Sequence, residues 1–492
     1  MVRLTLAFVL AMSVSPIAMA AGAKDTLTLG LVLEPPGLDP TAGAASAIRE
    51  VTYANIYEGL TRIDRAGAVQ PDLAEGWGIS DDGLTYTFHL IEGVKFHDGS
   101  PFDCSVVKFS YERAMAPDSV NAQKQLFEPI AHVDCPDART AVVVLKHPSA
   151  TFLFGMGWGD AVMVSPKSAA TNVTHPVGTG PFRFKQWVQG DRVELERNPD
   201  YWGARPKLSA VTFRFIADPA AATAAMLAGD VDAFSNFPAP EAVDQFKADP
   251  RFAVHIGTTE GKTILALNNA RKLFNDVRVR RALAYAIDRK QIVDGAESGF
   301  GAPIGSHYVP SDPGYVDLVG TYPFDPAKAK ALLAEAGVAP GTVFTIALPP
   351  PPYARRGGEI IAAMLADVGI TAKLEQVEWA QWIDQVFLKS NFDATVISHT
   401  EPRDLDIYAR EKYYFNYKNA DYKAMYTKYS LSTDPKATAD LLGQLQRKLA
   451  EDEPNVFLLA LPKVGVWNAK LRGLWENDPV PANDVGAVSW AE

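Results

Sequence analysis

The 492-residue sequence lacks the patterns that mark catalytic and metal centres. Its eight histidines form no pair at helical spacing, and no H-E-x-x-H, paired C-x-x-C, G-x-S-x-G or Walker loop is present. The run Ser105-Val106-Val107-Lys108 has the S-x-x-K spacing of penicillin-interacting enzymes, but the companion K-T-G is missing. We therefore expect a binding protein and not an enzyme, with no metal and no cofactor.

Positive charge and long apolar runs are also scarce. The chain has 47 lysines and arginines against 58 aspartates and glutamates, a net charge of −11, which makes nucleic acid and anionic membranes poor partners. No run beyond the first twenty residues approaches the ~20 apolar residues of a spanning helix. Because single cores stop growing near ~250–300 residues, the length predicts two or three domains.

The first twenty residues have the pattern of an export signal. Arg3 precedes a nearly continuous apolar run from Leu4 to Val14, and Ala18-Met19-Ala20 matches an A-x-A cleavage site. We interpret residues 1–20 as a removed signal peptide. No cysteine follows it, so there is no sign of lipid attachment. We expect the mature protein to lie free in an oxidising space such as the periplasm.

Only two cysteines are present, Cys104 and Cys135. In an exported protein, such a pair indicates a disulfide more readily than a metal site or a nucleophile. Two buried thiols are the alternative.

The predicted pattern of helices and strands changes twice along the chain. The apolar residues Ile48, Val51, Ile56 and Leu60 predict a helix over residues 48–60. Short alternating strands with Asp-Gly and Glu-Gly turns follow, and then a helix, which predicts an inserted α+β subdomain at about residues 60–175. Beyond about residue 265, helices and strands alternate, which predicts a second, partly parallel α/β domain.

Two stretches combine a buried strand with a polar, irregular exit. The run Thr26 to Leu33 ends in a proline- and glycine-rich segment, and Thr395 to Ile397 ends in a charged loop that contains Pro402. In an α/β sheet, ligands commonly bind beyond such strand ends, although a surface loop is the alternative. The candidate ligand-binding residues at these exits are Glu34, Gly37, Leu38, Ser398, His399, Thr400, Glu401, Arg403 and Asp404.

Three more residues are candidates for the same role. Asn236 and Phe237 leave a predicted strand, with a packed sheet edge as the alternative, and Tyr308 follows a Gly/Pro-rich loop. Trp379 and Trp382 flank a predicted helix, and we favour a core role over ligand stacking for both.

Several ordered motifs resemble those of the solute-binding proteins of dipeptide, oligopeptide and nickel ABC importers, family five. The resemblance covers about residues 25–475. The motifs include Tyr57-Glu58-Gly59-Leu60, Pro71-Asp72-Leu73-Ala74, Val94-Lys95-Phe96-His97-Asp98-Gly99, Asn198-Pro199-Asp200-Tyr201-Trp202-Gly203 and Val277-Arg278-Val279-Arg280-Arg281-Ala282-Leu283.

The resemblance implies an α/β, two-lobed fold with a hinge and an extra α+β subdomain in the first lobe. Lobe I would hold residues 21–265 and 460–492, and lobe II residues 266–459. The hinge would lie near Thr263 to Leu267 and Leu458 to Leu461. A monomer would enclose a small-molecule solute between its lobes and deliver it to an inner-membrane ABC permease.

The chain departs from this family at the residues that hold a dipeptide. In dipeptide binders, a tryptophan is followed three positions later by an aspartate, and this aspartate holds the peptide ammonium. Here His399 has the tryptophan's position, and Glu401 and Asp404 are both candidates for the acid. Proline also replaces the arginine that clamps the carboxylate, ahead of Tyr353-Ala354-Arg355-Arg356.

The solute is therefore predicted to be peptide-like or another polar or anionic organic compound. Arg403 and His399 would suit an anionic group, and a nickel chelate is a minor variant. A periplasmic chaperone or a sensory ligand-binding protein with the same fold is the alternative function.

Overall fold

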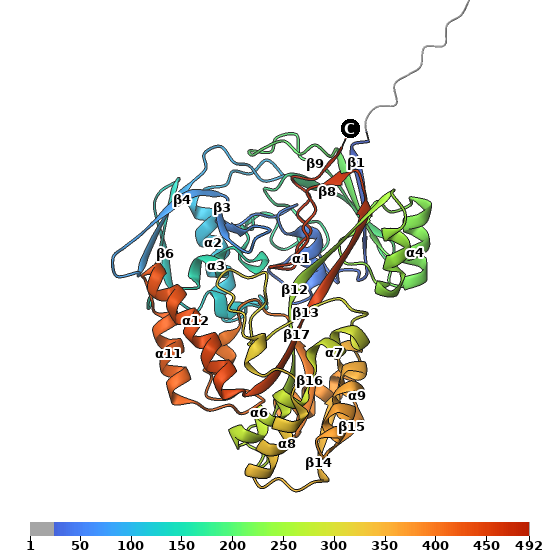
Figure 1. The fold of residues 1–492 in the computed structure, drawn as a ribbon. Helices are drawn as coiled ribbons and strands as arrows, with labels where there is room; N and C mark the ends of the chain where they lie inside the picture. Colours follow the sequence, from blue (N-terminus) through green and yellow to red (C-terminus); the bar gives the residue numbers. More distant parts are fainter. Residues whose placement is uncertain (1–23, 492) are drawn as a thin grey trace, which may run out of the picture.

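Two long antiparallel strands run through both halves of the molecule. The computed structural model describes residues 24–491, so the predicted signal peptide at residues 1–20 lies outside the described residues. Strands β12 (Phe252–Leu267) and β17 (Asn455–Asn468) pair along most of their length and connect an upper and a lower lobe in Figure 1. They are central in a sheet with the order β15-β14-β16-β12-β17-β11-β1-β10-β9-β8. The predicted two-lobed α/β fold is confirmed.

The upper lobe contains one half of this sheet and an apolar core beneath it. Strand β1 is parallel to β10 and β11, and β9 and β8 continue the sheet as antiparallel strands. Alternate residues of these strands, such as Leu29, Leu195 and Phe213, are completely buried, as the period-two pattern predicts. The elements are β1 (Thr26–Leu31), α1 (Ser46–Thr52), β2 (Thr61–Ile63), β3 (Val69–Pro71), β8 (Phe182–Val188), β9 (Arg192–Arg197), β10 (Ala210–Phe215), α4 (Pro219–Ala228), β11 (Ala233–Phe234), α5 (Val243–Lys247), β18 (Leu471–Arg472) and β19 (Ser489–Trp490).

The helix predicted over residues 48–60 is shorter than expected. Helix α1 ends at Thr52, and Ala54 adopts a left-handed φ of 59°. This turn presents the Asn55 side chain to the C-terminal segment, where it donates to the Asn483 carbonyl at 2.8 Å and accepts from the Val485 amide at 3.0 Å. The prediction was wrong here because a contact distant in sequence overrides the local apolar spacing.

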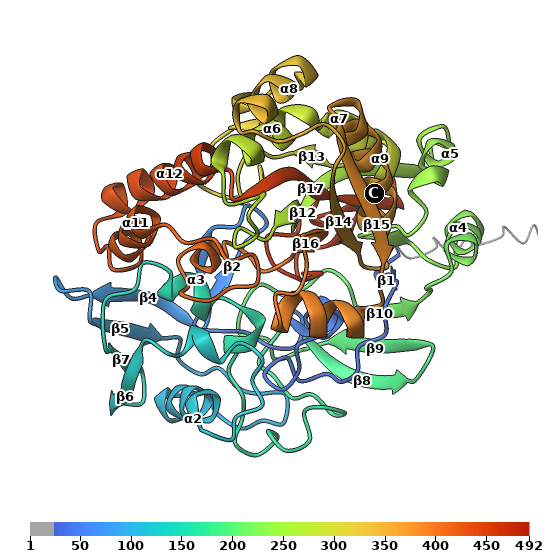
Figure 2. The same ribbon diagram turned by 90° about the horizontal axis from the view of Figure 1, so that it is seen from below.

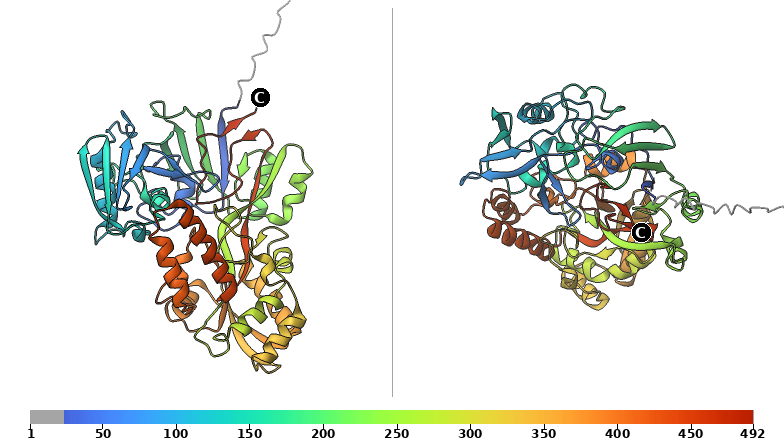
Figure 3. Two further views of the ribbon diagram at one scale, coloured as in Figure 1. Left: turned by 60° about the vertical axis from the view of Figure 1, so that its left-hand side comes forward. Right: turned by 90° about the horizontal axis from the view of Figure 1, so that it is seen from above.

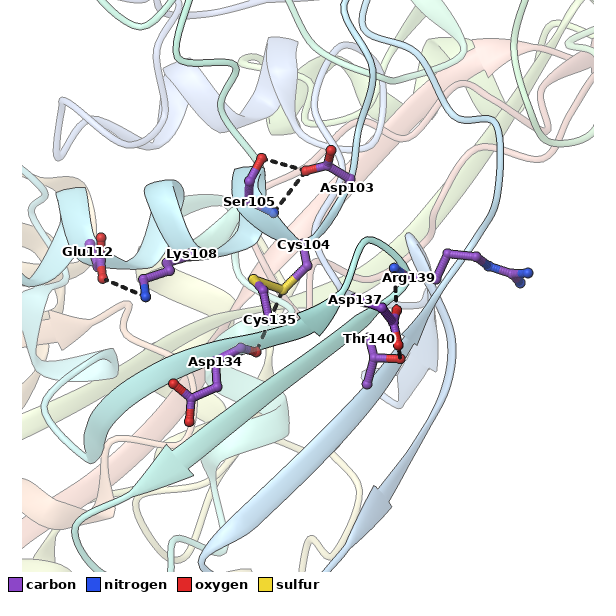
Figure 4. Close-up of a disulfide and its surroundings, with 10 residues drawn as sticks. All are labelled: Asp103, Cys104, Ser105, Lys108, Glu112, Asp134, Cys135, Asp137, Arg139 and Thr140. Carbon is purple, nitrogen blue, oxygen red and sulfur yellow. Dashed lines mark hydrogen bonds and ion pairs between the residues drawn. A yellow bond between two sulfur atoms is a disulfide. The ribbon is translucent and has the colours of Figure 1, made fainter.

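A four-stranded antiparallel subdomain extends from the upper lobe. Its strands have the order β4-β5-β7-β6, and α2 packs against β6 and β7. Cys104 at the start of α2 and Cys135 on β6 form the predicted disulfide, with their Cα atoms 5.7 Å apart (Figure 4). The elements are β4 (Ala74–Ile79), β5 (Thr85–Leu90), α2 (Cys104–Met115), β6 (Ile130–Asp137), β7 (Thr140–Leu145) and α3 (Phe152–Met156).

The lower lobe contains the other half of the long sheet. Strand β14 is parallel to both β15 and β16, which confirms the predicted partly parallel domain, and β16 is antiparallel to β12. Helix α9 lies beside these strands, and α7 packs against α9 (Figure 2). Asp276 caps α6 and Asp325 caps α8. The elements are α6 (Val277–Ala286), α7 (Arg289–Ala296), β13 (Ala302–Pro303), α8 (Pro326–Glu335), β14 (Thr342–Leu348), α9 (Pro352–Asp367), β15 (Ile370–Gln376), α10 (Trp379–Gln381), a π-helix (Trp382–Leu388), β16 (Ala394–His399), α11 (Ala420–Ser430) and α12 (Pro435–Asp452).

Helices α11 and α12 reach back from the lower lobe to the subdomain, as Figures 1 and 3 show. The amide of Ala150 donates to the carbonyl of Ser430 across this contact at 2.9 Å. Within residues 24–491, none of the helices has both the length and the apolar character needed to cross a membrane.

Candidate functional site

Two loops meet beside β12 at the centre of the molecule. The first, residues 304–315, follows β13, and the second, residues 400–404, follows β16. In the pairing of β12 with β16, Lys262 stands opposite His399. Since paired residues of neighbouring strands project to the same face, Lys262 faces the beginning of the charged loop.

Asp404 is the centre of a buried ionic cluster. Its Oδ1 atom lies 2.9 Å from Lys262 Nζ and 3.1 Å from His307 Nε2, and its Oδ2 atom lies 3.6 Å from His399 Nδ1. Lys262 Nζ also donates to the Glu401 carbonyl at 2.6 Å. The side chains of Lys262, His307, His399 and Asp404 are all less than a tenth exposed. Lys262 therefore binds both the carboxylate and the backbone of the loop.

The charge states of this cluster follow from burial and proximity. Burial alone would raise the pKa of Asp404, but Lys262 and the two imidazoles hold it far below its usual value. Burial lowers the pKa of His307, and it lowers the pKa of His399 to about 3. The cluster is therefore a carboxylate and ammonium pair between two neutral imidazoles.

Two tyrosines orient these imidazoles. The Tyr408 hydroxyl lies 3.0 Å from His307 Nδ1 and accepts a hydrogen bond from Asn455, so it is placed to donate its own proton to Nδ1. The Tyr414 hydroxyl lies 2.9 Å from His399 Nε2, and its ring stacks on that imidazole at an interplanar angle of 12°.

His307, His399 and Asp404 are the kinds of residue that bind metal ions, and their ligand atoms lie within 4.8 Å of one another. However, the Lys262 ammonium already supplies a positive charge next to Asp404. A divalent ion at about 4 Å from an ammonium would be repelled by about 8 kcal/mol at an effective dielectric constant of about 20. The arrangement therefore fits an internal ion pair better than a metal site.

Arg403 connects the two lobes. Its guanidinium donates to the Gly67 carbonyl at 2.6 Å and lies 3.8 Å from the centroid of the Phe154 ring, both in the upper lobe. In the lower lobe, it pairs with the Asp312 carboxylate at 3.4 Å. We expected the Arg403 guanidinium to bind an anionic group of the ligand. In the structure, it binds groups of the protein itself.

Replacing Arg403 by alanine is expected to lower the free energy of unfolding by about 2 kcal/mol, because the buried Asp312 loses its cation and the lobes lose a contact. Chemical denaturation would measure the loss. Arg403→Lys is the matched control, since it keeps the charge near Asp312 but loses the fork-shaped donor group. A loss below ~0.5 kcal/mol for Arg403→Ala would show that the contact across the lobes is energetically unimportant.

A cavity of about 420 Å³ adjoins Arg403 and is lined by residues of the subdomain and of helices α11 and α12. Tyr308 lines it, although this side chain is only 1% exposed and its hydroxyl lies 3.3 Å from the Pro313 carbonyl. The other lining residues include Tyr86, Leu153, Phe154, Tyr429 and Leu442. The walls are thus mainly aromatic and aliphatic.

The remaining candidates are dispersed. Glu34 is exposed and accepts hydrogen bonds from Trp187 Nε1 at 2.9 Å and from the Gly190 amide at 3.0 Å. Gly37 and Leu38 are buried nearby. Among the residues that the structure describes, no hydrogen bond joins any of these three to the ionic cluster.

Asn236 and Phe237 lie on the upper lobe beside β17. Asn236 is exposed and accepts a hydrogen bond from the Val464 amide at 3.4 Å. Phe237 packs between Phe234 and Phe246, with ring centroids 5.5 Å and 5.2 Å away. Its packing indicates a core role, although β11 is an interior strand between β17 and β1 and not a sheet edge.

The residues after β16 differ in accessibility. Thr400 and Glu401 are exposed, whereas Ser398 is half-buried. Trp382 is buried and donates to Thr395 Oγ1 at 3.0 Å, while Trp379 is 41% exposed. The predicted core role therefore holds for Trp382 but not for Trp379.

Sequence reasoning missed Lys262, Glu260, His307 and Asp312. A lysine and a glutamate next to the apolar run Ile264 to Leu267 were a usable signal, because a charge in a buried strand requires a partner. His307 and Asp312 offered no such signal, since the loop that contains them has no regular pattern.

Comparison with known proteins identifies the family. Residues 68–421 match the family described as bacterial extracellular solute-binding proteins, family 5. The chain belongs to this family. It is the solute-binding component of an ABC importer, as the relatives and the two-lobed fold agree.

The family-5 relatives include the glutathione-binding protein GsiB of Salmonella paratyphi A, which is 32% identical over 351 residues, 70% of this chain and 68% of the relative. HbpA2 from Haemophilus parasuis superimposes with a TM-score of 0.85 at 26% identity, covering 95% of this chain and 100% of that structure. AgaA from A. tumefaciens R10, in complex with agropinic acid, gives a TM-score of 0.76 at 25% identity, covering 95% and 99%.

Proposed function

We propose that this family-5 protein is a periplasmic, non-enzymatic binder of a polar or anionic organic solute. On this proposal, Asp404 does not bind an ammonium group of the solute. The observation that carries this proposal is the Lys262 ammonium, 2.9 Å from the carboxylate that would otherwise hold a peptide ammonium. Because the Lys262 charge is internal and buried, a second cation at Asp404 would be repelled instead of attracted.

The relatives' solutes support a carboxylate-bearing compound. GsiB is named for glutathione, and AgaA is described with agropinic acid. On this proposal, the solute of this chain is peptide-like or opine-like, and the exposed Thr400 and Glu401 at the end of β16 contact it.

We place the lobes as residues 21–265 with 460–492 and residues 266–459. The pairing of β12 supports a hinge there, because its first half pairs with β17 up to Thr258, while Lys262 to Ala266 pair with both β17 and β16. The register with β17 shifts between Thr258 and Lys262. An irregular ladder is easier to bend than a regular one.

The location and partners are proposed on the same basis. The signal pattern at residues 1–20 and the disulfide support an oxidising periplasm. We propose that the protein acts as a monomer whose closed form docks on an inner-membrane permease.

Thermal unfolding with matched ligands tests the solute class. We expect Ala-Leu and N-acetyl-Ala-Leu to act alike, and we expect glutathione or agropinic acid to raise the unfolding midpoint, because Asp404 requires no ligand ammonium. A solute at about 100 times its Kd would stabilise by about 2.7 kcal/mol.

Stabilisation by Ala-Leu but not by its acetylated form would contradict the proposal, since it would show that an ammonium is required. If mass spectrometry found no co-purified small molecule and no compound shifted the midpoint, the chaperone alternative would be favoured.

A further inference from the structure

A second group of buried carboxyls lies next to the Lys262 and Asp404 pair. Glu260 lies on β12, where the pairing with β17 changes register. Its side chain is 4% exposed, and neither of its oxygens has a hydrogen-bond donor among the described residues. The Oδ2 atom of Asp312, whose side chain is 1% exposed, is also without a donor there. Buried oxygens of this kind are costly unless they are neutralised.

The charges around these carboxyls do not balance. Lys262 Nζ lies 3.8 Å from Glu260 and 2.9 Å from Asp404, and Arg403 pairs with Asp312. Two cations thus face the three carboxyls of Glu260, Asp312 and Asp404, which leaves one negative charge in excess if all three are ionised.

No neighbouring group within residues 24–491 supplies the positive charge that would balance this excess. The imidazoles of His307 and His399 lie against Asp404, and burial lowers the pKa of both. Tyr308 and Tyr429 face the Asp312 and Arg403 pair, and burial raises the pKa of each phenol, so both are neutral.

Neither Glu260 nor Asp312 lines the cavity beside Arg403. A proton requires no volume of its own, and one proton shared between two carboxyls is a known way to accommodate a buried acidic pair. In agreement, burial and the negative charge of Asp312 raise the pKa of Glu260 well above its usual value.

We propose that Glu260 and Asp312 share one proton in the closed protein, and that closure of the lobes takes up this proton. The connection to closure is Arg403, which binds Asp312 in the lower lobe and the Gly67 carbonyl and Phe154 ring in the upper lobe. Opening would separate Arg403 from the upper lobe and admit water to both carboxyls, and the proton would then dissociate.

The sign of the pH dependence follows from this linkage. Glu260 has its raised pKa in the closed form only. The stabilisation of the closed form relative to the open form is therefore complete below the ordinary pKa of 4.5, and it is lost as the pH rises towards the raised pKa. Within that range, one proton per closure changes the ratio of closed to open protein by about tenfold per pH unit. Alkaline conditions would open the lobes, whichever solute is bound.

The variant Glu260→Gln tests this proposal, because glutamine imitates the neutral carboxyl. Small-angle scattering between pH 5 and pH 9 would measure the radius of gyration, and denaturation would measure stability over the same range. We expect the ligand-free wild type to expand as the pH rises. We expect Glu260→Gln to stay compact over the same pH range. We also expect its folding equilibrium constant to exceed that of the wild type, and the ratio of the two constants should grow about tenfold per pH unit.

The matched control is Glu453→Gln. Glu453 is 1% exposed within the lower lobe, and burial raises its pKa to about 8. This variant should change the pH dependence of unfolding but not that of the radius. The proposal is overturned if the wild-type radius is constant with pH or if Glu260→Gln expands like the wild type.

Repeating the scattering in sodium chloride and in choline chloride tests whether a metal cation replaces the proton. Compactness that requires sodium would also overturn the shared proton.

Discussion

Replacing Lys262 by methionine is expected to lower the free energy of unfolding by about 3–5 kcal/mol, because Asp404 would remain as a buried carboxylate without its cation. The Lys262 side chain is 1% exposed and also donates to the Glu401 carbonyl, so water cannot easily replace it. Chemical denaturation at pH 7 would measure the change.

The double variant Lys262→Met with Asp404→Asn distinguishes charge from packing. If the missing cation causes the loss, the double variant should recover most of the stability, because no buried charge is left unpaired. Asp404→Asn alone should cost less than Lys262→Met, since Lys262 keeps Glu260 at 3.8 Å and the Glu401 carbonyl as partners. An equal loss in all three variants would attribute the effect to packing.

The Lys262→Met variant also has a functional readout. With the internal ammonium removed, Asp404 becomes available to an ammonium from outside. Ala-Leu should then stabilise this variant more than N-acetyl-Ala-Leu does, although the two should be equivalent with the wild type. If the two ligands remained equivalent, Asp404 would have no access to the solute.

Removal of the disulfide has the second large expected effect. Cys104 and Cys135 close a loop of 31 positions, so the paired change to serine should lower the free energy of unfolding by roughly 3–4 kcal/mol in the chain-entropy model. The loss should be concentrated in the subdomain, because the bridge joins α2 to β6 (Figure 4). Denaturation monitored with hydrogen exchange of α2 and β6 would detect it.

Two controls accompany this measurement. The wild type in reducing buffer should match the double serine variant, and Lys108→Ser on the same helix should change stability by less than ~0.5 kcal/mol, because this side chain is 45% exposed. If reduction left the stability unchanged, the bridge would not contribute to the folded state.

Local patterns predicted the fold well where neighbouring residues decide the structure. The alternation in β5, the aspartate caps of α6 and α8 and the parallel strands of the lower lobe all follow from periodicity and capping. They failed at α1, where the contact of Asn55 with the C-terminal segment ends the helix early.

The candidate site was also predicted only where a local sequence pattern marks it. The sequence indicated the strand β16 and its charged exit, because an apolar β-branched run followed by charges and proline is a local pattern. It did not show whether Glu401 or Asp404 is the buried acid. The structure buries Asp404 and leaves Glu401 exposed.

The sequence by itself determined the family, the two-lobed α/β class and the pairing of the two cysteines, since these depend on ordered motifs, periodicity and a count of two. Only the tertiary structure decided that Lys262 neutralises Asp404 and that Arg403 joins the lobes. Both contacts depend on the register of β12 against β16 and on the path of two irregular loops. The physical reason is that a charge selects its partner by distance and burial, and neither quantity is local in the sequence.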